Sequence, residues 1–129
     1  MRKYWAVLAV ALLLFSATAQ AIESKEGGAS PYVKLDTITV NLQGLTQYLQ
    51  VGMALKFARP EIAELIKSWN PVIRHELILL LSSQNGEALA TIEGKKKVVA
   101  TAKAAINKTL KLDDKDGVTD VLFDSFVIQ

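Results

Sequence analysis

The sequence contains no cysteine and a single histidine, His75. The absence of cysteine excludes disulfide frameworks, zinc ribbons and thiol catalysis. One histidine is too few for a histidine-based metal centre. Half of the 129 residues are hydrophobic and 22% are charged, which is the balance of one globular domain rather than of a disordered chain. We therefore expect a single small domain with no cofactor, no bound metal and no catalytic equipment.

The first 21 residues have the pattern of a bacterial export signal. Arg2 and Lys3 precede an apolar run of eleven residues, Trp5 to Phe15, and a small-residue stretch then ends in Ala19-Gln20-Ala21. Eleven helical residues rise about 16 Å, roughly half of the hydrocarbon core of a bilayer. Residues 1–21 are predicted to be either a signal peptide cut after Ala21 or a retained signal anchor. Both alternatives place the rest of the chain outside the cytoplasm.

Removing residues 1–21 changes the charge of the protein. Removing Arg2 and Lys3 from the 15 basic residues leaves 13, equal to the 13 acidic residues. A neutral domain has no overall field that would attract nucleic acid or anionic lipid. We therefore expect no nucleic-acid partner.

The exported part begins with a polar, glycine-containing linker at residues 22–31 and continues as a domain at 32–129. From Tyr32 to Leu42, and again from Tyr48 to Phe57, apolar and polar residues alternate, which predicts two antiparallel strands. Val118 to Gln129 is rich in Val, Phe and Ile and predicts a last strand.

Three helices are predicted between these strands. The first begins at Pro60 and buries a stripe that ends at Trp69; the second follows Asn70-Pro71 and runs from Val72 to about Ser83. In the second, the core face is Ile73, Leu77, Leu80 and Leu81, and we expect Val72, Ile78 and Leu79 to widen it. The third runs from about Thr91 to Leu110, with Val99, Ala102, Ile106 and Leu110 inward. The predicted fold class is α+β, in the order β-β-α-α-α-β, with helices segregated from a small sheet.

Catalytic and ligand motifs fail when their spacing is tested. His75-Glu76 lacks the second histidine of a zinc protease. The turn at Asp114 and Asp116 lacks the bidentate glutamate of a calcium loop. Gly94-Lys95 lacks the flanking residues of a phosphate loop. The run Lys95-Lys96-Lys97 is either a solvated helical turn or a partner-facing patch. Glu61 and Glu64 are interpreted as surface charges. We therefore expect a protein that is not an enzyme and has no small-molecule substrate.

Short segments along residues 32–129 resemble the FliL family of flagellar basal-body-associated proteins. The C-terminal Asp120-Val121-Leu122-Phe123 and Phe126-Val127-Ile128-Gln129 are the most specific. The others are Val40-Asn41-Leu42, Tyr48-Leu49-Gln50-Val51, Pro71-Val72-Ile73-Arg74, Leu80-Leu81-Ser82-Ser83, Ile92-Glu93-Gly94-Lys95 and Ile106-Asn107.

The resemblance implies a periplasmic domain similar to stomatin/prohibitin-type membrane scaffolds, at the inner membrane beside the flagellar basal body. It implies a homo-oligomeric ring around the stator units that supports flagellar rotation, swimming or swarming. The family resemblance also implies a longer cytoplasmic lead and a full membrane helix, which the short residues 1–21 do not match. A periplasmic scaffold or chaperone-like module without a flagellar role is the alternative.

Arg74 is the one candidate interface residue, because it places a guanidinium on an otherwise apolar helix. The alternative is an intramolecular partner such as Asp36 or Asp120. A ring needs two different faces on each subunit, which the free edge of the sheet or the flank of the helices could supply.

Overall fold

The computed structural model describes residues 30–129. The predicted signal segment 1–21 and most of the predicted linker 22–31 lie outside the described residues. Among the helices that are described, none combines the length and apolar character needed to cross a bilayer.

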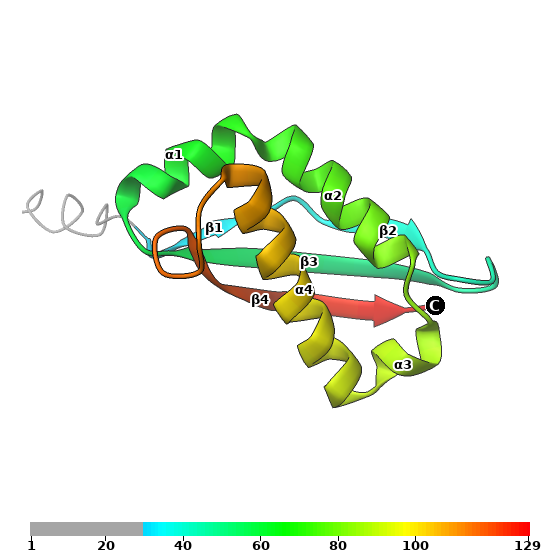
Figure 1. The fold of residues 1–129 in the computed structure, drawn as a ribbon. Coiled ribbons are helices and arrows are strands. Elements are labelled where there is room, and N and C mark those ends of the chain that lie inside the picture. Colours follow the sequence, from blue (N-terminus) through cyan, green and yellow to red (C-terminus); the bar gives the residue numbers. More distant parts are fainter. Residues whose placement is uncertain (1–29) are drawn as a thin grey trace, which may run out of the picture.

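Four antiparallel strands form the sheet, and the ten-residue β3 (Tyr48–Phe57) is its centre. The short strands β1 (Tyr32–Lys34) and β2 (Ile38–Asn41) follow one another along one edge of β3. The other edge of β3 pairs with β4 (Val118–Ile128) from Leu49–Ile128 to Phe57–Val118, with irregularities in register after Gly52 and after Lys56. Figure 1 shows these long strands side by side across the molecule.

The prediction of one continuous strand from Tyr32 to Leu42 is wrong. The chain leaves the strand conformation between Lys34 and Ile38, and Leu35 is buried there with its N–H donating to the carbonyl of Met53 at 2.9 Å. The carbonyl of Asp36 instead accepts a hydrogen bond from the side chain of Arg74. The main chain is thus drawn toward a helix at this point, which interrupts the strand.

Four helices separate β3 from β4. They are α1 (Pro60–Ser68), α2 (Asn70–Ser82), α3 (Gly86–Ala90) and α4 (Ile92–Leu110). The predicted starts of α1 at a proline and of α4 near Thr91 are confirmed. The Thr91 hydroxyl accepts from the N–H of Gly94 at 2.9 Å as an N-cap. The short α3 was not predicted. The observed order is therefore β-β-β-α-α-α-α-β, and the α+β class with a small antiparallel sheet is confirmed.

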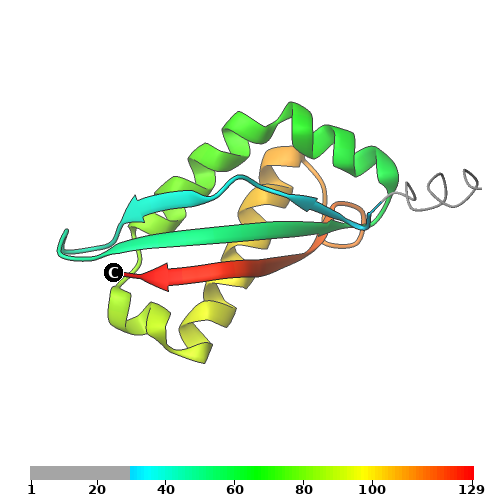
Figure 2. The ribbon, with the colours of Figure 1, turned by 180° about the vertical axis from the view of Figure 1, so that it is seen from behind.

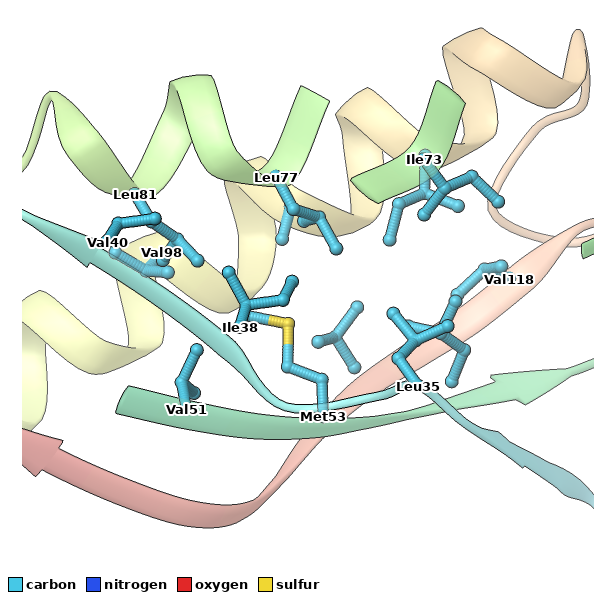
Figure 3. Close-up of a cluster of buried hydrophobic side chains, with 14 of the residues drawn as sticks. Leu35, Ile38, Val40, Val51, Met53, Ile73, Leu77, Leu81, Val98 and Val118 are labelled. Atoms are coloured by element: carbon cyan, nitrogen blue, oxygen red, sulfur yellow. The ribbon is translucent and has the colours of Figure 1, made fainter. Parts of the chain in front are cut away.

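The helices cover one face of the sheet, which Figure 2 shows from the opposite side. The core lies between the two layers, where Ile38, Val51 and Met53 from the sheet meet Ile73 and Leu77 of α2 (Figure 3). Along β3 the predicted alternation is confirmed on the core side. Leu49, Val51, Met53 and Leu55 are at most 1% exposed.

The prediction that Val72, Ile78 and Leu79 widen the buried face of α2 is wrong, since they are 40%, 37% and 56% exposed. Trp69, predicted to be in the buried stripe of α1, is 43% exposed. Only Ile73, Leu77 and Leu81 of α2 are fully covered. The reason is that the sheet is narrow and α2 shares the helical layer with α4. Only one stripe of side chains on α2 therefore contacts the core.

The predicted inward face of α4 is largely confirmed. Ala102, Ile106 and Leu110 are buried, while Val98 takes the fully buried position that was expected for Val99, which is half-buried.

Candidate functional site

The residues that formed partial catalytic motifs are separated in the structure. His75 is exposed on α2, and residues 30–129 contain no group of three or more His, Cys, Asp or Glu side chains that could hold a metal. The Asp113 side chain accepts from the N–H groups of Lys115 and Asp116 at 2.9 and 2.7 Å. The acidic turn is therefore organised by a side-chain cap of its own backbone.

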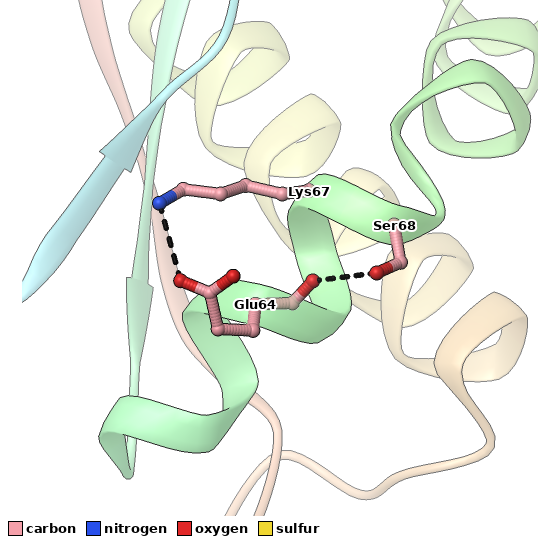
Figure 4. A network of polar contacts seen from close by, with 3 residues as sticks. All are labelled: Glu64, Lys67 and Ser68. Carbon is pink, nitrogen blue, oxygen red and sulfur yellow. Dashed lines mark hydrogen bonds and ion pairs between the residues drawn. The ribbon is translucent and has the colours of Figure 1, made fainter.

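Glu61 and Glu64 on α1 each pair with a base rather than with one another. The Lys67 ammonium lies 3.3 Å from the Glu64 carboxylate, while the Ser68 hydroxyl donates to the Glu64 carbonyl at 3.0 Å (Figure 4). Glu61 lies 4.0 Å from Arg59. Both pairs are exposed, so each contributes at most about 1 kcal/mol to stability.

Gly94 and Lys95 lie in the first turn of α4, against the C-terminal end of α3. A Cβ at Gly94 would lie 1.8 Å from the carbonyl oxygen of Ala88, so only glycine permits this approach. The Lys95 ammonium donates to the carbonyls of Leu89 and Ala90 at 2.9 and 3.2 Å. These are carbonyls at the C-terminal end of α3, which have no partner within that helix.

The same ammonium lies 4.7 Å from the ring centroid of Phe126 on β4. The Gly94-Lys95 segment, which does not form a phosphate loop, therefore packs α4 against α3 and β4.

Arg74 is half-buried on α2 and donates to the main-chain carbonyl of Asp36 at 2.9 Å. Of its two expected intramolecular partners, Asp36 is the one contacted, through its carbonyl and not its carboxylate. The Asp120 carboxylate instead accepts from the N–H of Val121 on its own strand at 2.8 Å. Arg74 thus holds the break between β1 and β2 against α2.

A hollow of about 690 Å³ lies between β1 and α1. Val33, Phe57, Pro60 and Ala63 supply apolar lining, and the charged lining residues are Lys34, Glu61, Glu64 and Lys67. A second hollow of about 200 Å³ shares Val33, Lys34 and Lys67 with it and extends toward Asp36 and Asn70. Together they make a shallow groove with charges of both signs, which is suited to contact with a protein surface.

The two edges of the sheet differ. The edge made by β1 and β2 is short and interrupted, whereas β4 is eleven residues long and pairs with β3 alone among the described strands. Unpaired edge strands are templates for the addition of another strand. Phe123, Phe126 and Ile128 lie half-buried on the helix side of β4.

Asn107 is the important residue that reasoning from the sequence missed. It is 5% exposed, its amide nitrogen donates to the carbonyl of Val118 at 2.8 Å, and its amide oxygen accepts from the N–H of Val118 at 2.7 Å. It therefore pairs with the first residue of β4 as a neighbouring strand would. A polar residue beside the inward-facing Ile106 was the available signal.

Comparisons with known proteins agree on one family. The family model described as flagellar basal body-associated protein FliL matches residues 32–129. The flagellar protein FliL of Escherichia coli K12 is 34% identical over 99 residues, which cover 76% of this chain and 64% of that relative. The flagellar protein FliL of Aquifex aeolicus is 30% identical over 84 residues, 65% of this chain and 50% of that relative. The match thus spans less than two thirds of the length of these relatives.

Proposed function

Because the chain belongs to the FliL family of flagellar basal body-associated proteins, we propose that it is an accessory protein of the flagellar motor. In this proposal it assembles around or beside the stator units and supports rotation, swimming or swarming. The observation that carries the proposal is the family match across 32–129, which covers every strand and helix described here.

The proposed assembly is a homo-oligomeric ring with a head-to-tail contact. Such a ring needs two different surfaces on each subunit. The long free edge of β4 and the interrupted edge with its adjoining groove are two such surfaces, on opposite sides of β3. This asymmetry supports the proposal. The relationship to stomatin/prohibitin-type scaffold domains stays a prediction.

We place the domain on the periplasmic side of the inner membrane, at the flagellar basal body. The support is the export pattern of residues 1–21. One measurement decides whether this segment is cleaved or retained. Mass spectrometry of the native protein should give either Ile22 or Met1 as the first residue. Ile22 means a periplasmic protein held by protein contacts, and Met1 means a single-pass anchor.

Arg74 is proposed to lie at the contact between subunits. Arg74→Met should lower the oligomer mass in analytical ultracentrifugation, whereas Arg74→Lys should retain part of the assembly because it keeps a cation and a donor. An unchanged oligomer mass in both variants would show that Arg74 serves only its bond to Asp36.

Deletion of the gene tests the motor role directly. The expected result is weaker swimming and swarming in cells that still build filaments, with recovery on expression of the intact chain. The decisive measurement is the rotation speed of tethered cells under high load. Unchanged rotation under load would refute the proposal.

A further inference from the structure

The basic residues of the described domain are concentrated on one helix. From Ile92 to Lys111, α4 and its C-cap contain six lysines, and Glu93 is the single acidic residue. Lys96, Lys97, Lys108 and Lys111 are exposed and Lys103 is half-buried. Figure 1 shows α4 crossing in front of the sheet, so its outer side lies on the surface of the helical layer.

These lysines have no acidic partner within residues 30–129. The three ion pairs there, Lys34–Asp124 at 3.0 Å, Arg59–Glu61 and Lys67–Glu64, all lie on other elements. Lys95 is already engaged by α3. The remaining lysines of α4 therefore form a basic surface that makes no ion pair within residues 30–129.

The lysines flank a strip of small side chains on the surface of the helix. Residues three and four positions apart are neighbours on a helix, so Ala100 is surrounded by Lys96, Lys97, Lys103 and Ala104. Ala100 and Ala104 are exposed. From Lys96 to Lys108 the strip is about 18 Å long, or about three helical turns.

We propose that this basic surface of α4, defined by Lys96, Lys97, Lys103 and Lys108, binds an acidic helix of another protein. Such a helix would lie along Ala100 and Ala104, with its carboxylates at three- and four-residue spacing reaching the lysines on either side. Small residues allow close approach of two helices, and the charges supply complementarity and orientation.

An anionic bilayer fits this surface less well than an acidic helix. Asp113 and Asp114 line a hollow of about 370 Å³ together with Lys103, Ala104 and Lys108, at the end of α4. A flat anionic membrane would cover the whole end of the helix and meet these carboxylates, whereas an acidic helix can end short of them. Between Lys96 and Lys108 the outward positions are Ala, Thr and Lys, without a large apolar side chain that could insert into lipid.

The test uses the full chain and two designed peptides. The acidic probe is a blocked helical peptide of alanine with glutamate at three- and four-residue spacing, and the neutral probe has glutamine in place of each glutamate. Vesicles of phosphatidylcholine with phosphatidylglycerol form a separate arm. Binding is measured by fluorescence anisotropy for the peptides and by co-sedimentation for the vesicles.

The test variant carries Lys96→Gln, Lys97→Gln, Lys103→Gln and Lys108→Gln, because glutamine has nearly the helix propensity of lysine. The matched control removes the same charge elsewhere, by Lys34→Gln, Lys56→Gln, Lys67→Gln and Lys115→Gln. Circular dichroism verifies that both variants are folded.

The intact chain should bind the acidic peptide and not the neutral one. The affinity of the α4 variant for the acidic peptide should fall by at least about tenfold, because each of the four exposed ion pairs contributes a factor of about two. The control should retain its affinity to within about threefold. Raising the salt from about 0.05 to about 0.3 M should weaken binding, since exposed charges are screened.

Equal binding of both peptides, an equal loss in both variants, or binding of the vesicles alone would overturn the proposal. No flagellar component takes part in this experiment. Its outcome is therefore separate from that of the motor proposal.

Discussion

Replacing Asn107 by leucine should destabilise the domain strongly, although leucine has the same branched arrangement of side-chain heavy atoms and the site is buried. Asn107 satisfies both the N–H and the carbonyl of Val118, and Val118 is 0% exposed. In the variant both main-chain groups would lose their partner without access to water. A Cβ on the preceding Gly117 would lie 2.4 Å from the Asn107 amide oxygen, so the strand approaches this side chain closely.

The magnitude follows from the cost of buried polar groups without partners. Each such group costs about 1–3 kcal/mol, so two groups at the middle of that range cost about 4 kcal/mol, and a gain of about 1–2 kcal/mol from burying an apolar side chain leaves a loss of about 2–3 kcal/mol. Urea denaturation followed by circular dichroism measures the free energy of unfolding. Asn41→Leu, at an exposed position of β2, is the control and should change this free energy by no more than about 0.5 kcal/mol.

Asn107→Asp separates the two hydrogen bonds. One carboxylate oxygen can still accept from the N–H of Val118, but the other would face the carbonyl of Val118, with no hydrogen between them. Protonation of the carboxyl group restores the donor, so the loss relative to the native chain should shrink as the pH falls. Urea midpoints for both proteins, measured at neutral and mildly acidic pH, test this direction.

The reasoning about Asn107 would be refuted by a leucine variant within about 1 kcal/mol of the native chain. A deficit of Asn107→Asp that grows on acidification would refute the assignment of donor and acceptor. Either result would mean that the start of β4 is held by packing alone.

Three further predictions concern stability and use the same denaturation measurement. Gly94→Ala should cost about 2 kcal/mol or more, because its Cβ would overlap a carbonyl of α3; an unchanged midpoint would contradict the close approach. Lys95→Met should cost about 1–2 kcal/mol through two lost hydrogen bonds, whereas exposed Lys96→Met should cost almost nothing; equal effects would argue against the capping role. Leu77→Ala should cost about 2–5 kcal/mol and Leu79→Ala about 0.5 kcal/mol or less, since they are 0% and 56% exposed; similar losses would place Leu79 in the core.

Much of the fold could be predicted where the local pattern is unambiguous. The alternation of β3 identifies its core residues because side chains of a strand point to opposite faces with a period of two. The start of α1 follows from Pro60, which acts within one helical turn, whereas the cap that begins α4 at Thr91 became clear only in the structure. The family could be identified because its short matching segments keep their order along the domain.

The candidate site was less predictable, because its parts come from segments that are distant in the sequence. Arg74 stood out as a lone guanidinium, but Asp36 contacts it through a main-chain carbonyl, which carries no signal in residue type. The basic surface of α4 could not be separated from an ordinary solvated face. That distinction depends on which carboxylates other elements bring near it.

The sequence by itself determined the class of the fold, the positions of the main strands and helices, and the family. Periodicity, proline and caps act over a few residues, and their effect does not depend on neighbours. The tertiary structure alone decided which flank of α2 is covered, where the first strand breaks and what Asn107 pairs with. Exposure and hydrogen-bond partners are set by how much surface the neighbouring elements offer, and here a narrow sheet leaves apolar residues of α2 in solvent.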